Sequence, residues 1–364
     1  MKHSFLNMLA LLICSRTLSR CFAFTPMPAL KTARFASTAQ FSNISDNKRQ
    51  RRIAINVEPD ASSTGTNSDS DSDTDTDTSV SPDPSPEIQT HLAEGLCAVY
   101  KPLEWSSNDV VMYIRGMLER DARGRGIKLP KRRSKSKKKV KVGHGGTLDP
   151  LATGVLVLGI GSGTKKLQEY LKGSKKYRAG VELGFETATL DMEGGREHVM
   201  ANATKTGPTE HVTEDMIITD VIPQFTGDIM QKPPIYSAIR KNGKRLYEQA
   251  RAGMTEDDIE IELREVSIHS LEYLSTDDNG KGLPCFGLDV ECGGGTYIRS
   301  LVRDMGYALD TCATMTSLER TKQGQFGLDD ALAKDDWSSE NIYAAVERSN
   351  ANLAALAEKE KEEE

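Results

Sequence analysis

One carboxylate, Asp149, lies in a loop that is rich in glycine and punctuated by proline. The segment 143–159 reads GHGGTLDPLATGVLVLG, and its apolar run 154–160 predicts a buried strand directly after the loop. A rigid strand holds a loop side chain in a fixed place, which suits catalysis by the carboxylate. Glycines at 143, 145 and 146 leave room for another backbone to come close. The alternative is that Asp149 only stabilises a turn, because Asp-Pro is a common turn opening.

Three more side chains suit the chemistry of a nucleic-acid base. Tyr177 lies among basic residues at 175, 176 and 178, and base stacking beside a phosphate backbone requires an aromatic ring in such surroundings. Tyr297 and Arg299 lie two residues apart, between a predicted strand and a predicted helix, so in an extended segment both would face one ligand. Arg299 is able to pair with a carboxylate through two hydrogen bonds. The alternatives are that Tyr177 is an ordinary tyrosine of a sheet, that Tyr297 belongs to the core, and that Arg299 lies on the surface without a binding role.

The elements that must position these residues begin at about residue 95. Ser107 is the predicted N-cap of an amphipathic helix, because apolar residues recur after it at helical spacing. Apolar or alternating runs predict strands at 96–100, from residue 175, at 265–274 and at 286–292, in addition to 154–160. Further helices are predicted near 167–171, 214–221, 244–252 and 298–309.

The remaining cysteines and glycines indicate neither a metal centre nor a nucleotide site. Cys97, Cys285, Cys292 and Cys312 show no CxxC spacing, so we expect buried free thiols in a reducing compartment and no metal. The segment GIGSGTKK has the glycines of a phosphate-binding loop, but its Thr-Lys order differs from the Gly-Lys-Ser/Thr of that motif. We therefore expect no nucleotide cofactor.

A dense run of positive charge precedes the Asp149 loop. Residues 120–141 contain twelve Lys or Arg and one acid, Asp121. We interpret this run as a flexible arm that neutralises phosphates, because it leads directly into the loop. The alternative is a solvated loop or a run that resembles a nuclear-localisation signal.

The first 90 residues are not typical of a folded domain. Residues 1–57 contain nine Lys or Arg and one acid, with a short apolar run near the start, which predicts a signal and transit leader. We expect a plastid of secondary origin, with the mitochondrion as the alternative, and no membrane association of the mature protein. Residues 58–90 predict a disordered linker. Its nine acids account for the acidic net charge of −6, so the remainder carries about +3, which suits a nucleic-acid partner.

Five blocks of the sequence occur in the order found in one family. They are YKPLEWSSNDVV, KVGHGGTLDPLATGVLVLGIGSGTKKL, KKYRAGVELGFETATLD, PPIYSAIRKNGKRLYEQARAG and GGTYIRSLVRDMG. Through them, residues 95–335 resemble the TruB family of tRNA pseudouridine synthases, in its eukaryotic branch, where GHGGTLDP replaces the bacterial GHTGALDP. The resemblance implies conversion of uridine to pseudouridine at position 55 of the tRNA T loop, without a cofactor or metal. It also implies an α+β fold with one large mixed, mostly antiparallel sheet, surrounding helices and a central catalytic cleft.

The resemblance further implies roles for single residues in catalysis. Asp149 matches the nucleophile, which attacks either the ribose or the uracil ring, and Arg299 matches its ionic partner. Tyr177 would stack on the extruded uracil. Tyr297 would lie against the ring and assist its deprotonation.

Four more positions match residues that contact or support the RNA. His144 matches a residue that enters the T loop and helps to turn the base out, and Leu318 matches one that lines the uracil pocket. Lys101 and Lys165 match positions near the active site, and from these we expect support and RNA contact. Tyr100 replaces the Asp that bacterial relatives usually carry there, a peripheral change.

The predicted organisation is a leader (1–57), a linker (58–90), a catalytic domain (91–340) and a charged helical tail (341–364). The C-terminal RNA-binding PUA domain of many bacterial members has no match after residue 340, so the insertion 120–141 is the expected grip on RNA. We expect a monomer that binds the tRNA T stem-loop. The alternatives are a tRNA-binding or folding protein in which modification is secondary, and a synthase that acts on other structured RNAs, including mRNA.

Overall fold

The computed structural model describes residues 92–129, 140–277 and 279–363. The predicted leader, the acidic linker and segment 130–139 of the basic insertion lie outside these residues. Those predictions therefore stay predictions.

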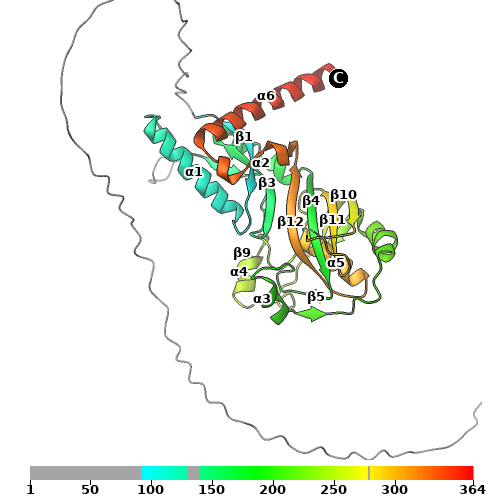
Figure 1. The fold of residues 1–364 in the computed structure, drawn as a ribbon. Coiled ribbons are helices and arrows are strands. Elements are labelled where there is room, and N and C mark those ends of the chain that lie inside the picture. Colours follow the sequence, from blue (N-terminus) through cyan, green and yellow to red (C-terminus); the bar gives the residue numbers. More distant parts are fainter. Residues whose placement is uncertain (1–91, 130–139, 278, 364) are drawn as a thin grey trace, which may run out of the picture. The chain divides into compact units, whose positions relative to one another are not determined.

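A ten-stranded mixed sheet forms the centre of the described chain (Figure 1). Its continuous order is β14 (Ala331–Leu332), β1 (Gly95–Lys101), β3 (Ala152–Ile160), β12 (Ala313–Gln323), β4 (Lys175–Leu183), β11 (Cys285–Cys292), β10 (Arg264–Leu274) and β7 (Gly227–Gln231). In addition, β2 (Val142–His144) pairs with β3, and β13 (Phe326–Gly327) pairs with β12. Among these pairs, β1 with β14 and β3 with β12 are parallel, and the others are antiparallel. The predicted α+β class with a mixed, mostly antiparallel sheet is confirmed.

Buried apolar side chains hold helix α5 (Ile298–Ala308) on the central strands. Val181 of β4, Leu288 of β11 and Met315 of β12 are at most 1% exposed and lie in one apolar cluster. Leu301 and Val302 of α5 join this cluster, because the apolar residues of the helix recur at helical spacing. Figure 1 shows α5 beside these strands. This packing fixes the first turn of α5 relative to the sheet.

Helices α1 (Ser107–Gly124) and α6 (Ser339–Glu363) contact each other and cover β1 and β3 at one end of the sheet (Figure 1). Ile114 and Leu118 of α1 share an apolar cluster with Ile342 and Val346 of α6. The last helix thus begins before the predicted domain boundary at residue 340. Its first turns belong to the core rather than to a separate tail.

The two ends of the basic insertion also belong to the folded part. Helix α1 continues to Gly124, and Leu129 and Val140 are buried on either side of segment 130–139. The arm predicted over 120–141 is therefore shorter than expected. Its remaining part lies outside the described residues.

Short elements connect the strands. They are η1 (Gly161–Lys165), α2 (Leu167–Lys172), α3 (Arg196–Ala201), η2 (Met216–Val221), η3 (Ile222–Phe225), α4 (Leu246–Arg251), η4 (Leu328–Asp330), η5 (Lys334–Asp336) and the paired strands β5 (Phe185–Glu186) with β6 (Lys205–Thr206) and β8 (Arg240–Lys241) with β9 (Lys244–Arg245). The helix predicted from residue 244 begins two residues later, because residues 244 and 245 pair with β8 in a hairpin.

The described residues also bear on membranes, metals and thiols. No helix among them is long and apolar enough to cross a membrane, and no group of three potential metal ligands occurs in the same ranges. Cys97, Cys285, Cys292 and Cys312 are free and buried, as predicted. Burial raises the pKa of the Cys97 thiol to about 12, so this thiol stays protonated at neutral pH.

Candidate active site

The loop that carries Asp149 runs from the end of β2 to the start of β3, and helix α1 holds it at one point. The Ser107 hydroxyl accepts from the Leu148 N–H at 2.8 Å and donates to the Leu148 carbonyl at 3.0 Å. The predicted N-cap is therefore wrong by one residue. Ser106 caps the helix through a reciprocal pair with Asp109, and this leaves Ser107 to bind the loop.

Lys101, the last residue of β1, holds the other side of the loop. Its side chain has no exposed surface, and Nζ donates to the carbonyls of Pro102 (2.9 Å), Trp105 (2.5 Å) and Pro150 (3.2 Å). Burial lowers the pKa of the Lys101 ammonium to about 8, and the charge of Asp149 opposes this. Burial leaves Lys101 in a supporting position, and the predicted RNA contact is wrong.

The space beside the loop glycines, where a side chain would lie, is occupied by other side chains of the protein. A Cβ atom on Gly145 would lie 2.7 Å from Tyr170 Cβ, and one on Gly146 would lie 3.1 Å from Gln323 Nε2. A Cβ atom on Gly143 would likewise meet α2 at 3.1 Å. The prediction that these glycines leave room for another backbone is therefore wrong, because α2 and β12 occupy the space.

Arg299, in the first turn of α5, forms an ion pair with Asp149 in which Nε lies 2.9 Å from Oδ2. Nη1 donates to the carbonyl of Thr189 at 2.7 Å, and Nη2 donates to that of Tyr236 at 3.1 Å. The Arg299 side chain is 6% exposed, whereas that of Asp149 is 36% exposed. The guanidinium is thus fixed on three sides, while the carboxylate keeps a surface for a ligand.

A second carboxylate, Asp191, lies near the same guanidinium and was missed by the sequence analysis. Its Oδ2 is 3.8 Å from Arg299 Nε, and its side chain is 6% exposed. Burial raises the pKa of Asp191, and the charge of Arg299 opposes this rise. In the sequence this residue shows only as part of an acidic turn, TLDMEG, after a predicted strand. Its nearness to Arg299 follows from the fold.

Tyr297 and Arg299 meet at the site for a reason other than the predicted one. Tyr297 is the extended N-cap of α5 and Arg299 is helical, so the two do not share an extended segment. Gln231 of β7 fixes Tyr297: the Tyr297 N–H donates to Gln231 Oε1 at 2.9 Å, and Gln231 Nε2 donates to the Tyr297 carbonyl at 3.1 Å. Burial raises the pKa of the Tyr297 phenol, and the charge of Asp149 acts in the same direction. Tyr297 also lies two residues before Arg299, the ionic partner of Asp149, so the N-terminus of α5 brings both residues to the carboxylate.

Tyr177 and Leu318 form an apolar wall beside the loop. Both side chains are 8% exposed and lie in one cluster with Leu148, the neighbour of Asp149. Strand β12 brings Leu318 opposite Ala152, at the start of β3, through their parallel pairing. The structure thus collects the predicted stacking ring and the predicted pocket residue next to the carboxylate.

His144 and Lys165 lie at different distances from this centre. His144 is half-buried at the end of β2, and its burial lowers the pKa of the imidazole, with the charge of Arg320 acting in the same direction. Lys165 is exposed at the end of η1, beyond the opposite end of β3 from the Asp149 loop. A nine-residue strand spans roughly 25 Å, so Lys165 is not brought together with Asp149.

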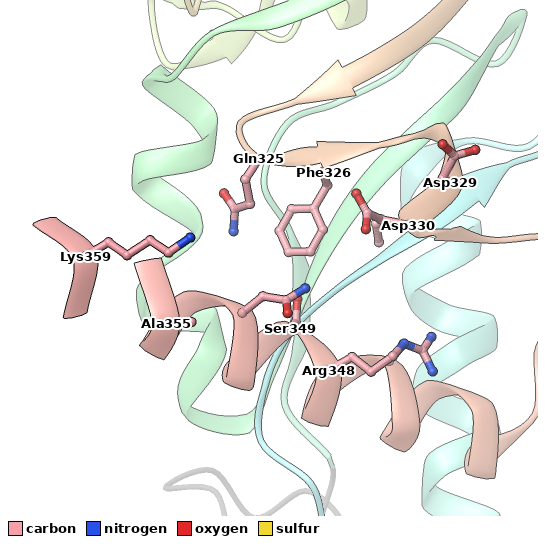
Figure 2. A pocket seen from close by; sticks show the side chains of 11 residues that line it. Gln325, Phe326, Asp329, Asp330, Arg348, Ser349, Ala355 and Lys359 are labelled. Carbon is pink, nitrogen blue, oxygen red and sulfur yellow. The ribbon is translucent and has the colours of Figure 1, made fainter. Parts of the chain in front are cut away.

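Two cavities of about 440 Å³ differ in their relation to this site. One is lined by Thr189 and Tyr236, whose carbonyls bind Arg299, so it adjoins the ion pair. The other lies between α6 and the β13–η4 segment, where Figure 2 shows Phe326 on one side and Ser349 of α6 on the other. None of the predicted site residues lines this second cavity.

Comparison with known proteins decides the family. A model described as TruB family pseudouridylate synthase, N terminal domain, matches residues 131–298. Pseudouridylate synthase TRUB1 of Mus musculus is 42% identical over 256 residues, which cover 70% of each chain. The chain belongs to the TruB family. Another TruB relative, tRNA pseudouridine synthase B of Parabacteroides distasonis, is 38% identical over 250 residues, which cover 68% of this chain and 94% of that protein. The crystal structure of a Cbf5-Nop10-Gar1 complex matches 68% of this chain and 55% of that chain, at 28% identity and a TM-score of 0.46.

Membership of the TruB family makes the chain a pseudouridine synthase, an isomerase that acts on RNA. The resemblance inferred from the five sequence blocks is confirmed. The family model ends at residue 298, so Arg299 and Leu318 lie beyond it. Their place in the site follows from the ion pair with Asp149 and from the β12 pairing.

Proposed function

We propose that this chain converts uridine to pseudouridine in tRNA, at position 55 of the T loop, with Asp149 as the nucleophile. The observation that carries the mechanism is the contrast between a buried, fixed Arg299 and a carboxylate that is 36% exposed. Bacterial relatives named tRNA pseudouridine synthase B support the substrate. The name of the mouse relative specifies no RNA, so other structured RNAs, including mRNA, are the alternative substrates.

The isomerisation exchanges one bond to the ribose for another. The C1′–N1 bond of uridine breaks and a C1′–C5 bond forms, while C5 loses a proton and N1 gains one, so atoms and electrons balance without a co-reactant. Attack by Asp149 on the ribose or on the uracil ring gives a covalent adduct that divides this change into smaller steps. Arg299 holds the carboxylate in place and aimed at the substrate.

The reacting uridine must leave the T-loop stack, which requires a few kcal/mol. Tyr177 and Leu318 offer an apolar wall to the extruded base, and stacking on an aromatic ring contributes about 1–3 kcal/mol. Tyr297 lies close enough to Asp149 to feel its charge, and we assign its phenol to the proton transfer from C5. His144 is assigned to the T loop, where it helps to hold the base outside the stack.

Replacing Asp149 by Asn tests the nucleophile. We expect Asp149→Asn to lower pseudouridine formation in a T stem-loop transcript by at least about 1,000-fold, because an amide forms no such adduct. RNA affinity, measured by filter binding, should stay close to that of the wild type. The matched control is Asp304→Asn, which neutralises a carboxylate on α5 that pairs with Arg303 instead of the site.

Three outcomes would each contradict a part of the proposal. Appreciable turnover by Asp149→Asn would remove the nucleophile assignment. Rescue of tRNA function in cells by the inactive variant would favour the alternative, in which binding or folding of tRNA is the main activity. Faster turnover of an mRNA hairpin than of the T stem-loop would change the substrate class and leave the mechanism in place.

A further inference from the structure

Strands β3 and β12 separate beside the Asp149 loop, and two side chains fill the gap. The parallel pairing covers residues 318–320 of β12 and 152–154 of β3. At the end of this pairing, Arg320 Nε donates to the Val155 carbonyl at 2.7 Å, and further along, Gln323 Oε1 accepts from the Val157 N–H at 3.2 Å. These side chains replace the backbone hydrogen bonds that the diverging strands no longer make.

The same two side chains also hold the loop itself. Arg320 Nη2 donates to the Gly146 carbonyl at 3.3 Å, and Gln323 Nε2 donates to the Gly145 carbonyl at 2.9 Å. Arg320 is 1% exposed and Gln323 has no exposed surface. The missing side chains of the two glycines make this approach feasible, because the Gln323 amide lies only 3.1 Å from where a Gly146 Cβ would be.

Arg320 also lies beside Tyr177, and the charge of its guanidinium opposes the rise that burial causes in the pKa of the Tyr177 phenol. The two residues lie opposite each other where β12 pairs with β4. One planar group therefore joins strand β3 to the Asp149 loop and lies beside the predicted stacking ring. Lysine could not reproduce this, because an ammonium has no planar fork of donors.

The charge of Arg320 also requires an explanation beyond folding. Among the described residues no carboxylate is recorded within ion-pair distance of Arg320, and its guanidinium donates to the carbonyls of Val155 and Gly146. Burying a charge without an ionic partner is unfavourable, so apolar packing would fill the same volume at a lower cost. A role in placing reacting groups accounts for its presence.

We propose that Arg320 is a positioning residue that, with Gln323, fixes the Asp149 loop relative to the Tyr177 ring, so that nucleophile and stacking surface face the same uracil. The inference rests on the proposed function of Asp149 and Tyr177. It concerns the geometry of the site, because Arg320 is buried behind the loop and does not touch the substrate.

A double-mutant cycle between Arg320→Lys and Tyr177→Phe tests this proposal in the full chain. Tyr177→Phe removes the hydroxyl and keeps the ring. We expect Arg320→Lys to lower the single-turnover rate at saturating T stem-loop RNA by about 100-fold, as small misplacements of reacting groups do. RNA affinity should be unchanged. The combined loss should be about ten-fold smaller than the product of the single losses, because both changes break one shared contact.

The matched control is Arg303→Lys. Arg303 is 5% exposed on α5 and bonds the Lys232 carbonyl and Asp304, away from the loop. We expect this variant to lose stability in urea and to keep the wild-type rate. If Arg320→Lys behaves in the same way, or if the losses in the cycle multiply, the positioning role is overturned.

Two further variants keep the proposal testable if Arg320→Lys does not fold. Tyr177→Phe and Gln323→Met should each lower the rate at unchanged RNA affinity, and wild-type rates in both would overturn the proposal. All these variants retain Asp149. Failure of the proposed nucleophile is thus recognised separately, by turnover in Asp149→Asn.

Discussion

At the scale of single residues, Arg299 is placed before any substrate arrives. Its three nitrogens bind Asp149, Thr189 and Tyr236, and Asp191 lies close by. A group whose partners are already in position needs no reorganisation during the reaction, which is how preorganised sites stabilise developing charge. Asp149, the proposed nucleophile, keeps 36% of its side chain exposed, whereas Arg299 and Asp191 are each 6% exposed.

His144 provides a prediction about pH. Because burial lowers its pKa, the folded chain binds this proton less readily than the unfolded chain does at pH values just below 6.5. The free energy of unfolding should therefore fall as the pH drops below about 6.5, while the contribution is constant above it. The free energy of unfolding, measured in urea at pH 7.5 and 5.5, should fall less between these pH values for His144→Asn than for the wild type. The exposed His198 supplies the control. If the free energy of unfolding of His198→Asn fell as little as that of His144→Asn, the pH dependence would not come from His144.

At the scale of elements, the loop between β2 and β3 is held by backbone contacts from three directions. Ser107 binds it from α1, Lys101 from β1, and Gln323 from β12. Each of these side chains is almost fully buried. The position of Asp149 therefore depends on how helix and strands pack, beyond the local turn.

Ser106 and Ser107 allow a paired test of this arrangement. Ser107→Ala leaves the buried N–H and carbonyl of Leu148 without a partner, so we expect a stability loss of about 1–3 kcal/mol. The single-turnover rate should also fall, by about ten-fold, because the loop loosens. Ser106→Ala removes only the helix cap and should cost about 1 kcal/mol with an unchanged rate. Equal rates in both variants would show that α1 does not position Asp149.

At the scale of the whole molecule, the densest runs of charge lie in segments other than those that form the apolar core. The acidic linker accounts for the sign of the net charge, and twelve basic residues lie in 120–141. Helix α6 completes the core against α1, so the last folded element stabilises the end of the sheet from which the basic segment departs. We propose that this segment supplies much of the electrostatic grip on RNA.

The salt dependence of binding tests that proposal. Segment 130–139 contains seven Lys or Arg, and each lost phosphate contact should reduce the slope of log affinity against log salt by about 0.7–0.9. Replacing all seven by Gln should therefore weaken binding and flatten the slope, with little change in the single-turnover rate at saturation. Exchanging the lysines for arginines keeps the charge and should leave the slope unchanged. A wild-type slope in the Gln variant would contradict the proposal and favour the alternative, a solvated loop that does not contact RNA.

Much of the fold could be predicted, because strand alternation and helical stripes are local patterns. The apolar runs around Val157 and Leu288 and the stripe around Leu301 specify elements within windows of about ten residues. Boundaries were less certain. The N-cap of α1 is Ser106 rather than the predicted Ser107, because only the packed loop shows which of two adjacent serines faces inward.

The sequence by itself determined the chain's family, its main strands and helices, and the choice of Asp149 as the candidate nucleophile, because each depends on contiguous residues. The tertiary structure decided which side chains surround that carboxylate. Asp191, which follows β5, lies near Arg299 of α5, Gln231 reaches Tyr297 across 66 positions, and Arg320 reaches Gly146 across 174. The physical reason is the strand order, in which β12 lies between β3 and β4. Residues that are distant along the chain thereby become neighbours, and no local spacing encodes that arrangement.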